Sequence, residues 1–360
     1  MTEIKVGDKN IGAGCPVYII AEIGSNFDGS LSRAKYLAKL AKEIGANAYK
    51  IQNFLAPKIV SEIGFKNVQI SFQSKWDKSV VEVYRKAEFP REWLKELSDY
   101  CRRIRIDFFS SPYDIDAVGL LEEINVPAYK IGSGEIDNLD FLKYIARIGK
   151  PVILGCGAAT LEEIGNAVST IREEGNNQIV LLQCVTNYPS PIVDANIRAM
   201  VDIKERFGVE VGYSDHSIGE KDGGDDPLFG LTVPLGSVAL GATIIEKHFT
   251  DDCTRKGPDH PFAMDVKGFK KMVDSIRMLE KGLGNGIKKV MPSERESVVI
   301  QRRGIYAGKN VSKGQKISED MIVFLRPAKN LRPSQKILIL GKTAKRNILF
   351  GEPITLEDVI

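Results

Sequence analysis

Two histidines near the middle of the chain have the residue type and the surroundings of metal ligands. His216 stands in Gly-Tyr-Ser-Asp-His-Ser and His248 in Ile-Glu-Lys-His-Phe-Thr, and the third of only three histidines, His260, follows Gly-Pro-Asp. Neutral imidazole is the commonest protein ligand of a catalytic divalent metal. An isolated histidine is more often a half-buried polar side chain. Two at equivalent strand ends, beside serine, lysine and carboxylate residues, favour a metal site.

Two lysines stand inside apolar runs, where a lysine is rarely buried without an anionic partner. One interpretation of Lys50 and Lys130 is an internal ion pair with Glu22 or Glu246. The other is that both ammonium groups, together with nearby serine hydroxyls, bind a phosphate or a carboxylate. The sequence leaves both interpretations open.

A glycine-flanked serine follows the second of these lysines. Ser133 lies in Ile-Gly-Ser-Gly-Glu, and its glycines let backbone N–H groups approach an anion closely. Glu135 beside this turn could transfer protons or, equally well from its spacing, cap a helix.

These residues follow short apolar runs that alternate with amphipathic helical stretches from about residue 17 to about residue 285. Eight such units over ~250 residues predict an α/β fold of the (β/α)8 TIM-barrel type, with a doubly wound open sheet as the alternative. Active sites of such barrels lie at the carboxyl ends of the strands, where most ends here carry reactive side chains. The eight predicted strands are 17–21, 48–51, 106–109, 128–131, 152–154, 179–182, 209–211 and 243–245.

The strand-helix pattern stops near residue 285. We predict a barrel domain at 1–285, a linker at 286–300 and a small β-rich domain at 301–360, where a turn glycine, an apolar residue and a short acidic helix recur at 311–322 and 348–360. Two segments interrupt the barrel pattern. Residues 53–90, with Phe72 and Trp76, predict a structured lid or extra helix, and 219–227 predicts an exposed loop.

The composition is ordinary for a globular protein: 43% hydrophobic and 27% charged residues, with 50 Lys and Arg against 47 Asp and Glu for a net charge of +3. This near balance gives no reason to expect nucleic acid or a membrane as a partner. Five widely spaced cysteines without a C-x-x-C pair indicate free thiols in a reducing compartment. With no apolar signal segment and no run near the ~20 residues that span a bilayer, we expect a cytoplasmic protein.

Taken in order, the motifs resemble the sialic acid (N-acetylneuraminate) synthase family, which includes enzymes making legionaminic and pseudaminic acids. The resemblance covers essentially the whole chain and rests on 21–24, 129–133, 212–216, 246–250, 257–260, 302–303 and 326–327. It implies a TIM barrel followed by an antifreeze-like (SAF) domain of the β-clip type, in a domain-swapped homodimer. It also implies condensation of phosphoenolpyruvate with an N-acylated amino-sugar aldehyde, either N-acetylmannosamine or a 2,4-diacetamido-trideoxyhexose, with release of phosphate.

The resemblance also implies a role for each candidate residue. His216 and His248 would hold Mn²⁺ or Mg²⁺, with Co²⁺ as a further candidate. Arg326 would come from the partner chain to the N-acyl end of the sugar. The remaining roles are phosphoenolpyruvate binding by Lys50, Lys130, Ser133, Ser214 and, as a weaker candidate, Ser111; sugar contacts by Gln52, Tyr188 and Asp259; and proton handling by Glu22 and Glu135, with Lys130 also counted as catalytic.

The chain departs from the family pattern in several places. Gly155-Cys156-Gly157-Ala158 replaces the usual Ser-Thr-Gly-Met, so a phosphate-contacting serine is missing. The other departures are Phe27 for the usual histidine, Gln183 before Cys184, Ala328 after Arg326-Pro327, and the 219–227 insertion. They bear on substrate identity and rate more than on reaction class.

Three other functions stay open. The chain could be a barrel synthase that acts on a phosphorylated sugar, although such an enzyme needs a second phosphate site. It could be a non-catalytic sugar-binding homologue. The C-terminal domain could have an ice-binding or purely structural role.

Overall fold

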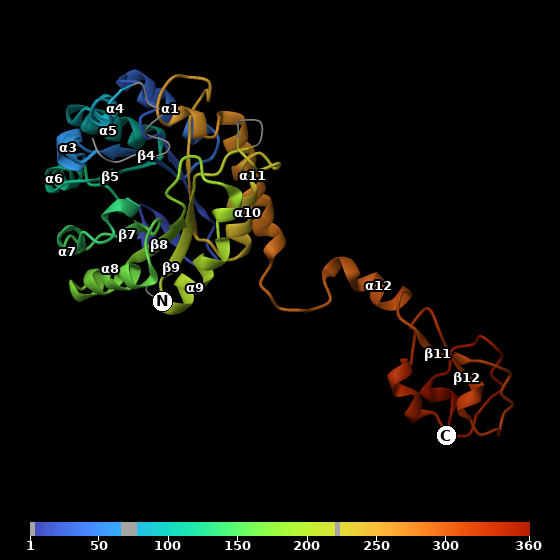
Figure 1. The fold of residues 1–360 in the computed structure, drawn as a ribbon. Helices are drawn as coiled ribbons and strands as arrows, with labels where there is room; N and C mark the ends of the chain where they lie inside the picture. Colours follow the sequence, from blue (N-terminus) through green and yellow to red (C-terminus); the bar gives the residue numbers. More distant parts are fainter. Residues whose placement is uncertain (1–3, 66–77, 220–223) are drawn as a thin grey trace. The chain divides into compact units, whose positions relative to one another are not determined.

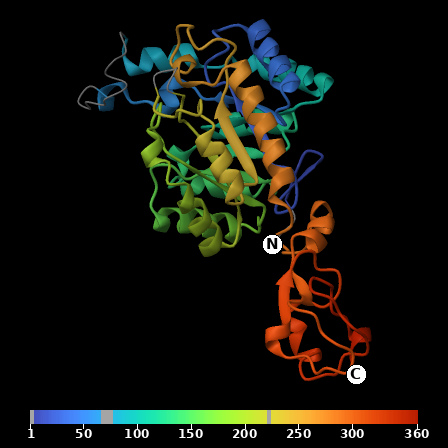
Figure 2. The same ribbon diagram turned by 90° about the vertical axis from the view of Figure 1, so that its right-hand side faces the viewer.

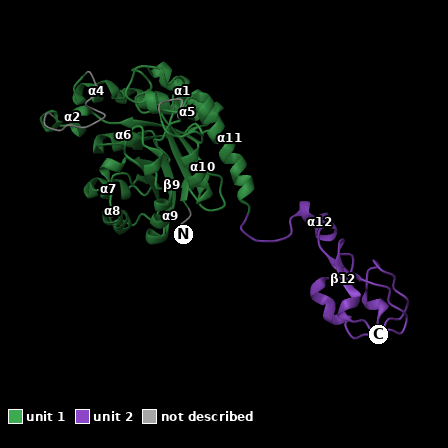
Figure 3. Cartoon of the chain, turned by 45° about the vertical axis from the view of Figure 1, so that its right-hand side comes forward, with its two compact units in different colours: residues 1–284 green, residues 285–360 purple. Residues whose placement is uncertain are grey.

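Eight parallel strands form the centre of the first of two compact units, which comprise Met1–Gly284 and Asn285–Ile360 (Figure 3). The computed structural model describes residues 4–65, 78–219 and 224–360. The strands coincide with the eight predicted from apolar runs. They are β3 (Tyr18–Glu22), β4 (Ala48–Asn53), β5 (Asp107–Pro112), β6 (Tyr129–Ile131), β7 (Val152–Gly155), β8 (Ile179–Cys184), β9 (Glu210–Asp215) and β10 (Ile244–His248).

The strand order is β5-β4-β3-β10-β9-β8-β7-β6, and every neighbouring pair in it is parallel. The two outermost strands of this order, β5 and β6, contact each other, so the sheet is a nearly closed barrel. Every residue of β3, β9 and β10 is buried, as expected for strands covered on both faces. The predicted (β/α)8 architecture is confirmed.

Helices follow the strands and surround the sheet (Figures 1 and 2). The first illustrates why they form: Ser30 caps its N-terminus by accepting from Arg33 N, and its buried face consists of Ala34, Leu37, Ala38 and Ala41. The outer helices are α1 (Leu31–Glu43), α5 (Leu94–Ile104), α6 (Ile115–Glu123), α7 (Leu139–Ala146), α8 (Leu161–Glu173), α9 (Ile197–Phe207), α10 (Thr232–Ala239) and α11 (Val266–Leu283).

The segment between β4 and α5 contains the short helices α2 (Ala56–Ile59), α3 (Glu62–Phe65) and α4 (Val80–Ala87). Phe72 and Trp76 of the predicted lid lie outside the described residues, as do 220–223 of the predicted loop.

An N-terminal hairpin, β1 (Ile4–Val6) and β2 (Lys9–Ile11), covers the amino-terminal end of the barrel. Ile4, Val6 and Ile11 are buried in the main core. Asp107, the first residue of β5, accepts hydrogen bonds from Lys9 Nζ (3.0 Å) and Tyr18 Oη (2.7 Å). This end is therefore filled, which leaves the carboxyl end of the strands for a site.

The second unit has its own core, formed by Ile305, Ala307, Val311, Ile317, Leu331, Ile339, Ala344, Ile348, Ile354 and Val359. Its only regular sheet in the described residues is the antiparallel pair β11 (Gly304–Ala307) and β12 (Ile322–Leu325), and isolated bridges such as Val311 to Ile348 join its loops. Gly314 and Gly351, the turn glycines of the repeated pattern, have φ of 84° and 83°. Residues 292–300 contain a 3₁₀ turn (Pro292–Glu294) and α12 (Arg295–Ile300).

Across the described ranges, no helix combines the length and the hydrophobicity needed to cross a bilayer.

Candidate active site

The side chains that point into the barrel at the carboxyl ends of its strands are set by strand register. Parallel pairing places Glu22 of β3 beside Lys50 of β4 and beside His248 of β10. It also places Gln52 beside Ser111 and Ser214 beside Glu246. Since alternate residues share one face of a strand, this register brings residues far apart in sequence to one place.

Four charged groups form a buried cluster at this end. Lys50 Nζ forms an ion pair with Glu22 Oε2 and lies 3.7 Å from Glu246 Oε2, and Lys130 Nζ lies 3.5 Å from Glu246 Oε1. All four residues are at most 5% exposed. Two cations and two carboxylates balance, which is the condition under which buried charges are tolerated.

The two carboxyl groups of this cluster differ in acidity. Burial raises the pKa of Glu22 despite the neighbouring Lys50. Burial acts the same way on Glu246, but Lys130 and Lys50 outweigh it and lower the pKa of that carboxyl. Burial would lower the pKa of Lys50, but Glu22 and Glu246 more than offset it and raise that pKa. Paired acids whose pKa values are pushed apart can take different roles in proton transfer.

Hydroxyl and amide groups extend the cluster. Lys50 Nζ donates to Ser111 Oγ (3.2 Å), Ser214 Oγ donates to Glu246 Oε1 (2.9 Å), and Gln52 Nε2 donates to Glu22 Oε1 (3.4 Å). Six of the predicted site residues therefore meet at one place: Glu22, Lys50, Gln52, Ser111, Lys130 and Ser214.

Ser133 follows β6 and lies against Gly155, the position at which the usual serine is missing. Its Oγ accepts from Gly157 N (3.0 Å) and lies 3.2 Å from Cys184 Sγ. A Cβ on Gly155 would stand 2.6 Å from this hydroxyl. Glycine at 155 thus leaves the space that the Ser133 hydroxyl occupies.

The two histidines form an aromatic group with Tyr188 and Phe262. The His216 and His248 ring centroids are 5.6 Å apart, Tyr188 lies 4.2 Å from His216, and Phe262 lies 4.8 Å from His248. Burial lowers the pKa of His216 to about 4 and that of His248 well below its usual value, so both rings are neutral near pH 7.

Neutral rings with free nitrogens fit a metal. His216 Nδ1 lies 2.7 Å from the carbonyl oxygen of Val185, which can only accept, so Nδ1 carries the proton and Nε2 keeps its lone pair. His248 Nδ1 is buried without a hydrogen-bond partner in the structure. Among the described residues, no group of three or more His, Cys, Asp or Glu could hold an ion.

The remaining predicted residues lie around this centre or in the second unit. Asp259 Oδ2 accepts from Ser25 N (2.6 Å) and Ser25 Oγ (2.7 Å), and burial raises the pKa of this carboxyl. Glu135, in the 3₁₀ turn Ser133–Glu135, accepts from Asn138 Nδ2 (3.1 Å), outside the charged cluster. Arg326 directly follows β12 in the second unit and is exposed.

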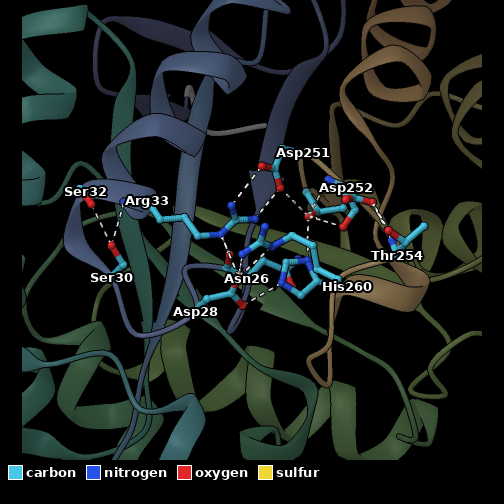
Figure 4. Close-up of polar contacts among 11 residues, drawn as sticks. Asn26, Asp28, Ser30, Ser32, Arg33, Asp251, Asp252, Thr254 and His260 are labelled. Atoms are coloured by element: carbon cyan, nitrogen blue, oxygen red, sulfur yellow. Dashed lines mark hydrogen bonds and ion pairs between the residues drawn. The ribbon is translucent and has the colours of Figure 1, made fainter.

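Sequence reasoning named Glu246 only as a possible ion-pair partner and did not name Phe262 at all. The signal for Glu246 was strand alternation: it is two residues before His248 and so faces the same side of β10. Phe262 lies in an irregular segment, where periodicity carries no information. His260, the third histidine, stands in a separate polar network (Figure 4).

Comparison with known proteins gives matches along nearly the whole chain. The model of the NeuB family matches residues 37–288, and that of the SAF domain matches 302–360. The chain is 37% identical to an N,N'-diacetyllegionaminic acid synthase of Campylobacter jejuni, over 91% of this chain and 96% of that protein. It is 36% identical to a pseudaminic acid synthase of Helicobacter pylori, over 96% and 98%.

The chain is also similar to a solved structure of a sialic acid synthetase. The N-acetylneuraminic acid (sialic acid) synthetase of Leptospira borgpetersenii, in complex with citrate, superposes with a TM-score of 0.72 at 33% identity, covering 82% of this chain and 95% of that one.

Proposed function

Because the chain belongs to the NeuB family and ends in a SAF domain, we propose that it is a nonulosonic acid synthase. Its relatives are named as synthases of legionaminic and pseudaminic acid. The proposed reaction joins phosphoenolpyruvate, water and an N-acylated amino-hexose in its aldehyde form, and it yields a nine-carbon 2-keto acid and phosphate. The observation that carries the proposal is that two buried lysines, Lys50 and Lys130, both lie within ion-pair distance of the Glu246 carboxylate.

The two ammonium groups suit a small, highly charged anion. Lys50 and Lys130 bind the phosphate and carboxylate of phosphoenolpyruvate, with hydroxyl donors from Ser133, Ser214 and Ser111. The hydrogen bond of Lys50 to Ser111 and that of Ser214 to Glu246, the carboxylate that lies near both lysines, support these roles. Because the site is buried, these charges act at low dielectric and stabilise the departing phosphate strongly.

The sugar binds against Gln52, Tyr188 and Asp259. The enol carbon attacks the aldehyde carbon, the new alkoxide takes a proton, and water adds to the adjacent cationic carbon. The phosphate then leaves with cleavage of its bond to carbon. Glu22, whose pKa is raised by burial, and Glu135 are the proposed proton-handling groups.

His216 and His248 are the proposed ligands of a divalent cation, Mn²⁺ or Mg²⁺ with Co²⁺ as a further candidate. When bound, such an ion supplies a Lewis acid that polarises the sugar aldehyde. The protein holds the two rings neutral through burial and orients His216 through Val185. Water or substrate oxygens would complete the coordination.

We extend the proposal to a domain-swapped homodimer working in the cytoplasm. Arg326 of the partner subunit then contacts the N-acyl group of the sugar. The family resemblance and the exposure of this arginine at the end of β12 support that role.

Phosphate release from phosphoenolpyruvate in the presence of Mn²⁺ tests the proposal. We expect release only with N-acetylmannosamine or a 2,4-diacetamido-trideoxyhexose. Release with a phosphorylated aldose instead would favour the related barrel synthases. Absence of turnover with every sugar would favour a non-catalytic homologue.

A further inference from the structure

His260 is the buried centre of a polar network beside the site (Figure 4). The residue is 0% exposed, and its Nε2 lies 2.9 Å from Asp28 Oδ1 and its Nδ1 2.8 Å from Thr250 Oγ1. A carboxylate only accepts, so Nε2 donates to Asp28. In the neutral ring Nδ1 then accepts from the Thr250 hydroxyl, which in turn accepts from Asp252 N (3.3 Å).

The order carboxylate, imidazole, hydroxyl is that of a nucleophilic triad, but Thr250 cannot be a nucleophile. Its side chain belongs to a residue that is 0% exposed, so no substrate reaches the hydroxyl. The array therefore holds parts of the protein together.

The parts it holds are the loops after β3 and β10. Asp28, in the loop after β3, also accepts from Arg255 NH2 (2.7 Å) and lies 3.1 Å from Arg33 Nε. Arg33 in turn donates to Asn26 O (2.8 Å) and to Asp251 Oδ2 (3.0 Å). Asp251, Arg255 and His260 all belong to the loop after β10, so the two loops are joined at several points.

The same loops carry the sugar side of the site. Asp259 directly precedes His260 and accepts from Ser25 of the β3 loop. Phe262 belongs to the 3₁₀ turn His260–Phe262 and packs on His248 (4.8 Å) and Tyr188 (5.1 Å). The backbone also passes close to the imidazole, because a Cβ on Gly257 would stand 2.8 Å from His260 Cδ2.

We propose that His260 is a positioning residue: through Asp28 and Thr250 it fixes Asp259 and Phe262 against the sugar, and it leaves the phosphoenolpyruvate side unaffected. This rests on the proposed function. The lysines that bind phosphoenolpyruvate stand on β4 and β6, which are held by the sheet and not by these loops. His260 thus increases the affinity for the sugar although it does not contact the sugar.

Thr250→Val tests the proposal, because valine keeps the volume and removes the partner of His260. We expect the Michaelis constant for the sugar to rise about tenfold, given that a misplacement of ~1 Å can cost about 100-fold. The constant for phosphoenolpyruvate should stay nearly unchanged, because the substitution alters contacts on the sugar side alone. Thr250→Ser, which restores the hydroxyl, should restore the sugar constant.

The chain offers a matched control at the other end of the same strand. Thr243 precedes β10, is 7% exposed, and donates its hydroxyl to Val211 O (2.9 Å). Thr243→Val also removes a buried hydroxyl but does not touch the network, so both constants should stay unchanged. Equal rises of both constants in Thr250→Val, or no rise, would overturn the positioning role.

Gly257→Ala and Asp28→Asn keep the proposal testable should Thr250→Val fold poorly. The added methyl of Gly257→Ala would press on the imidazole ring. Asp28→Asn weakens the charged partner of His260 at a position whose side chain is 26% exposed. Both should raise the sugar constant selectively.

Hydrogen–deuterium exchange separates this inference from the proposed function. In Thr250→Val the segment 251–264 should exchange faster than in the wild type, and in Thr243→Val it should not. Faster exchange in a protein that turns over no sugar would defeat the proposed function and leave only the part of the inference that His260 orders the loop after β10. Unchanged exchange in an active enzyme would overturn the positioning role alone.

Discussion

Lys50 and Glu22 form an ion pair whose side chains are only 3% and 1% exposed. Glu246, on the other side of Lys50, pairs also with Lys130, so the cluster is neutral as a whole. A buried pair contributes little net stability, but removing one partner leaves a charge that nothing compensates. Substituting one member of the cluster should therefore lower the stability of the fold more than substituting a cation and its carboxylate partner together.

Lys50→Met should lower the free energy of unfolding of the first unit by about 3 kcal/mol, because Glu22 and Glu246 then face one cation. The double variant Lys50→Met, Glu22→Gln should recover at least about 1 kcal/mol of this loss. Urea denaturation measures both. As a control, Lys270→Met breaks an exposed pair with Asp274 and should have little effect. Equal losses in the single and double variants would contradict the account of the cluster.

His216→Ala should abolish metal-dependent turnover with the fold intact. Even changes next to a metal ligand cost about 10–100-fold in affinity, so loss of a ligand should cost at least ~100-fold. Mn²⁺ binding is measured through the electron paramagnetic resonance signal of the free ion. Activity is measured in parallel, after a chelator has removed the metal and again after Mn²⁺ has been added back. Undiminished Mn²⁺ binding by the variant would remove His216 from the ligand set.

Arg326→Ala should raise the Michaelis constant for the sugar more than that for phosphoenolpyruvate. A mixing experiment tests whether the arginine acts in the partner. If it does, a mixed dimer of Arg326→Ala and His216→Ala subunits contains one site with both residues intact, and mixing restores activity at low sugar concentration. Mixed dimers as inactive as the two parents would show that Arg326 acts within its own chain or not at all.

The second unit should lose stability in acid through Asp358. Burial opposes ionisation, but Arg346 and Thr355 outweigh it and lower the pKa of this carboxyl, and Arg346 Nε donates to it at 2.7 Å. Since the folded pKa lies below the unfolded value of about 3.9, the contribution is present above that value and is lost as the pH falls through the folded pKa. Asp358→Asn should thus lower the melting temperature at pH 7, with the difference shrinking once the pH falls below about 3.9 and disappearing below the folded pKa. A difference independent of pH would contradict this.

The eight strands could be predicted from the sequence. Each is a short apolar run between helical stretches, which is the pattern of parallel strands buried on both faces. The sequence was also sufficient to bring six site residues together, since strand ends meet at one end of a barrel. The pairing of Lys130 with Glu246 was one of the two interpretations that the sequence left open, and the contact of the two side chains across the interior is what establishes it. The short hairpin Ile4–Ile11 was not predictable, because its six strand residues are too few for a periodic signal.

The role of Ser133 shows the same limit. The loss of serine at 155 was visible in the sequence, but the occupation of that space by the Ser133 hydroxyl depends on how closely the turn after β6 approaches the end of β7, where a Cβ on Gly155 would stand 2.6 Å from Ser133 Oγ. Nothing in the sequence assigned a role to His260, and only the contacts with Asp28 and Thr250 assign it one.

The most direct test of the central claim uses phosphoenolpyruvate labelled with ¹⁸O at the oxygen between carbon and phosphorus. With Mn²⁺ and an N-acylated amino-hexose aldehyde, the account predicts sugar-dependent phosphate release, with the label in the phosphate and a nine-carbon keto acid as the other product. Phosphate released without sugar, or label retained in the organic product, would contradict it.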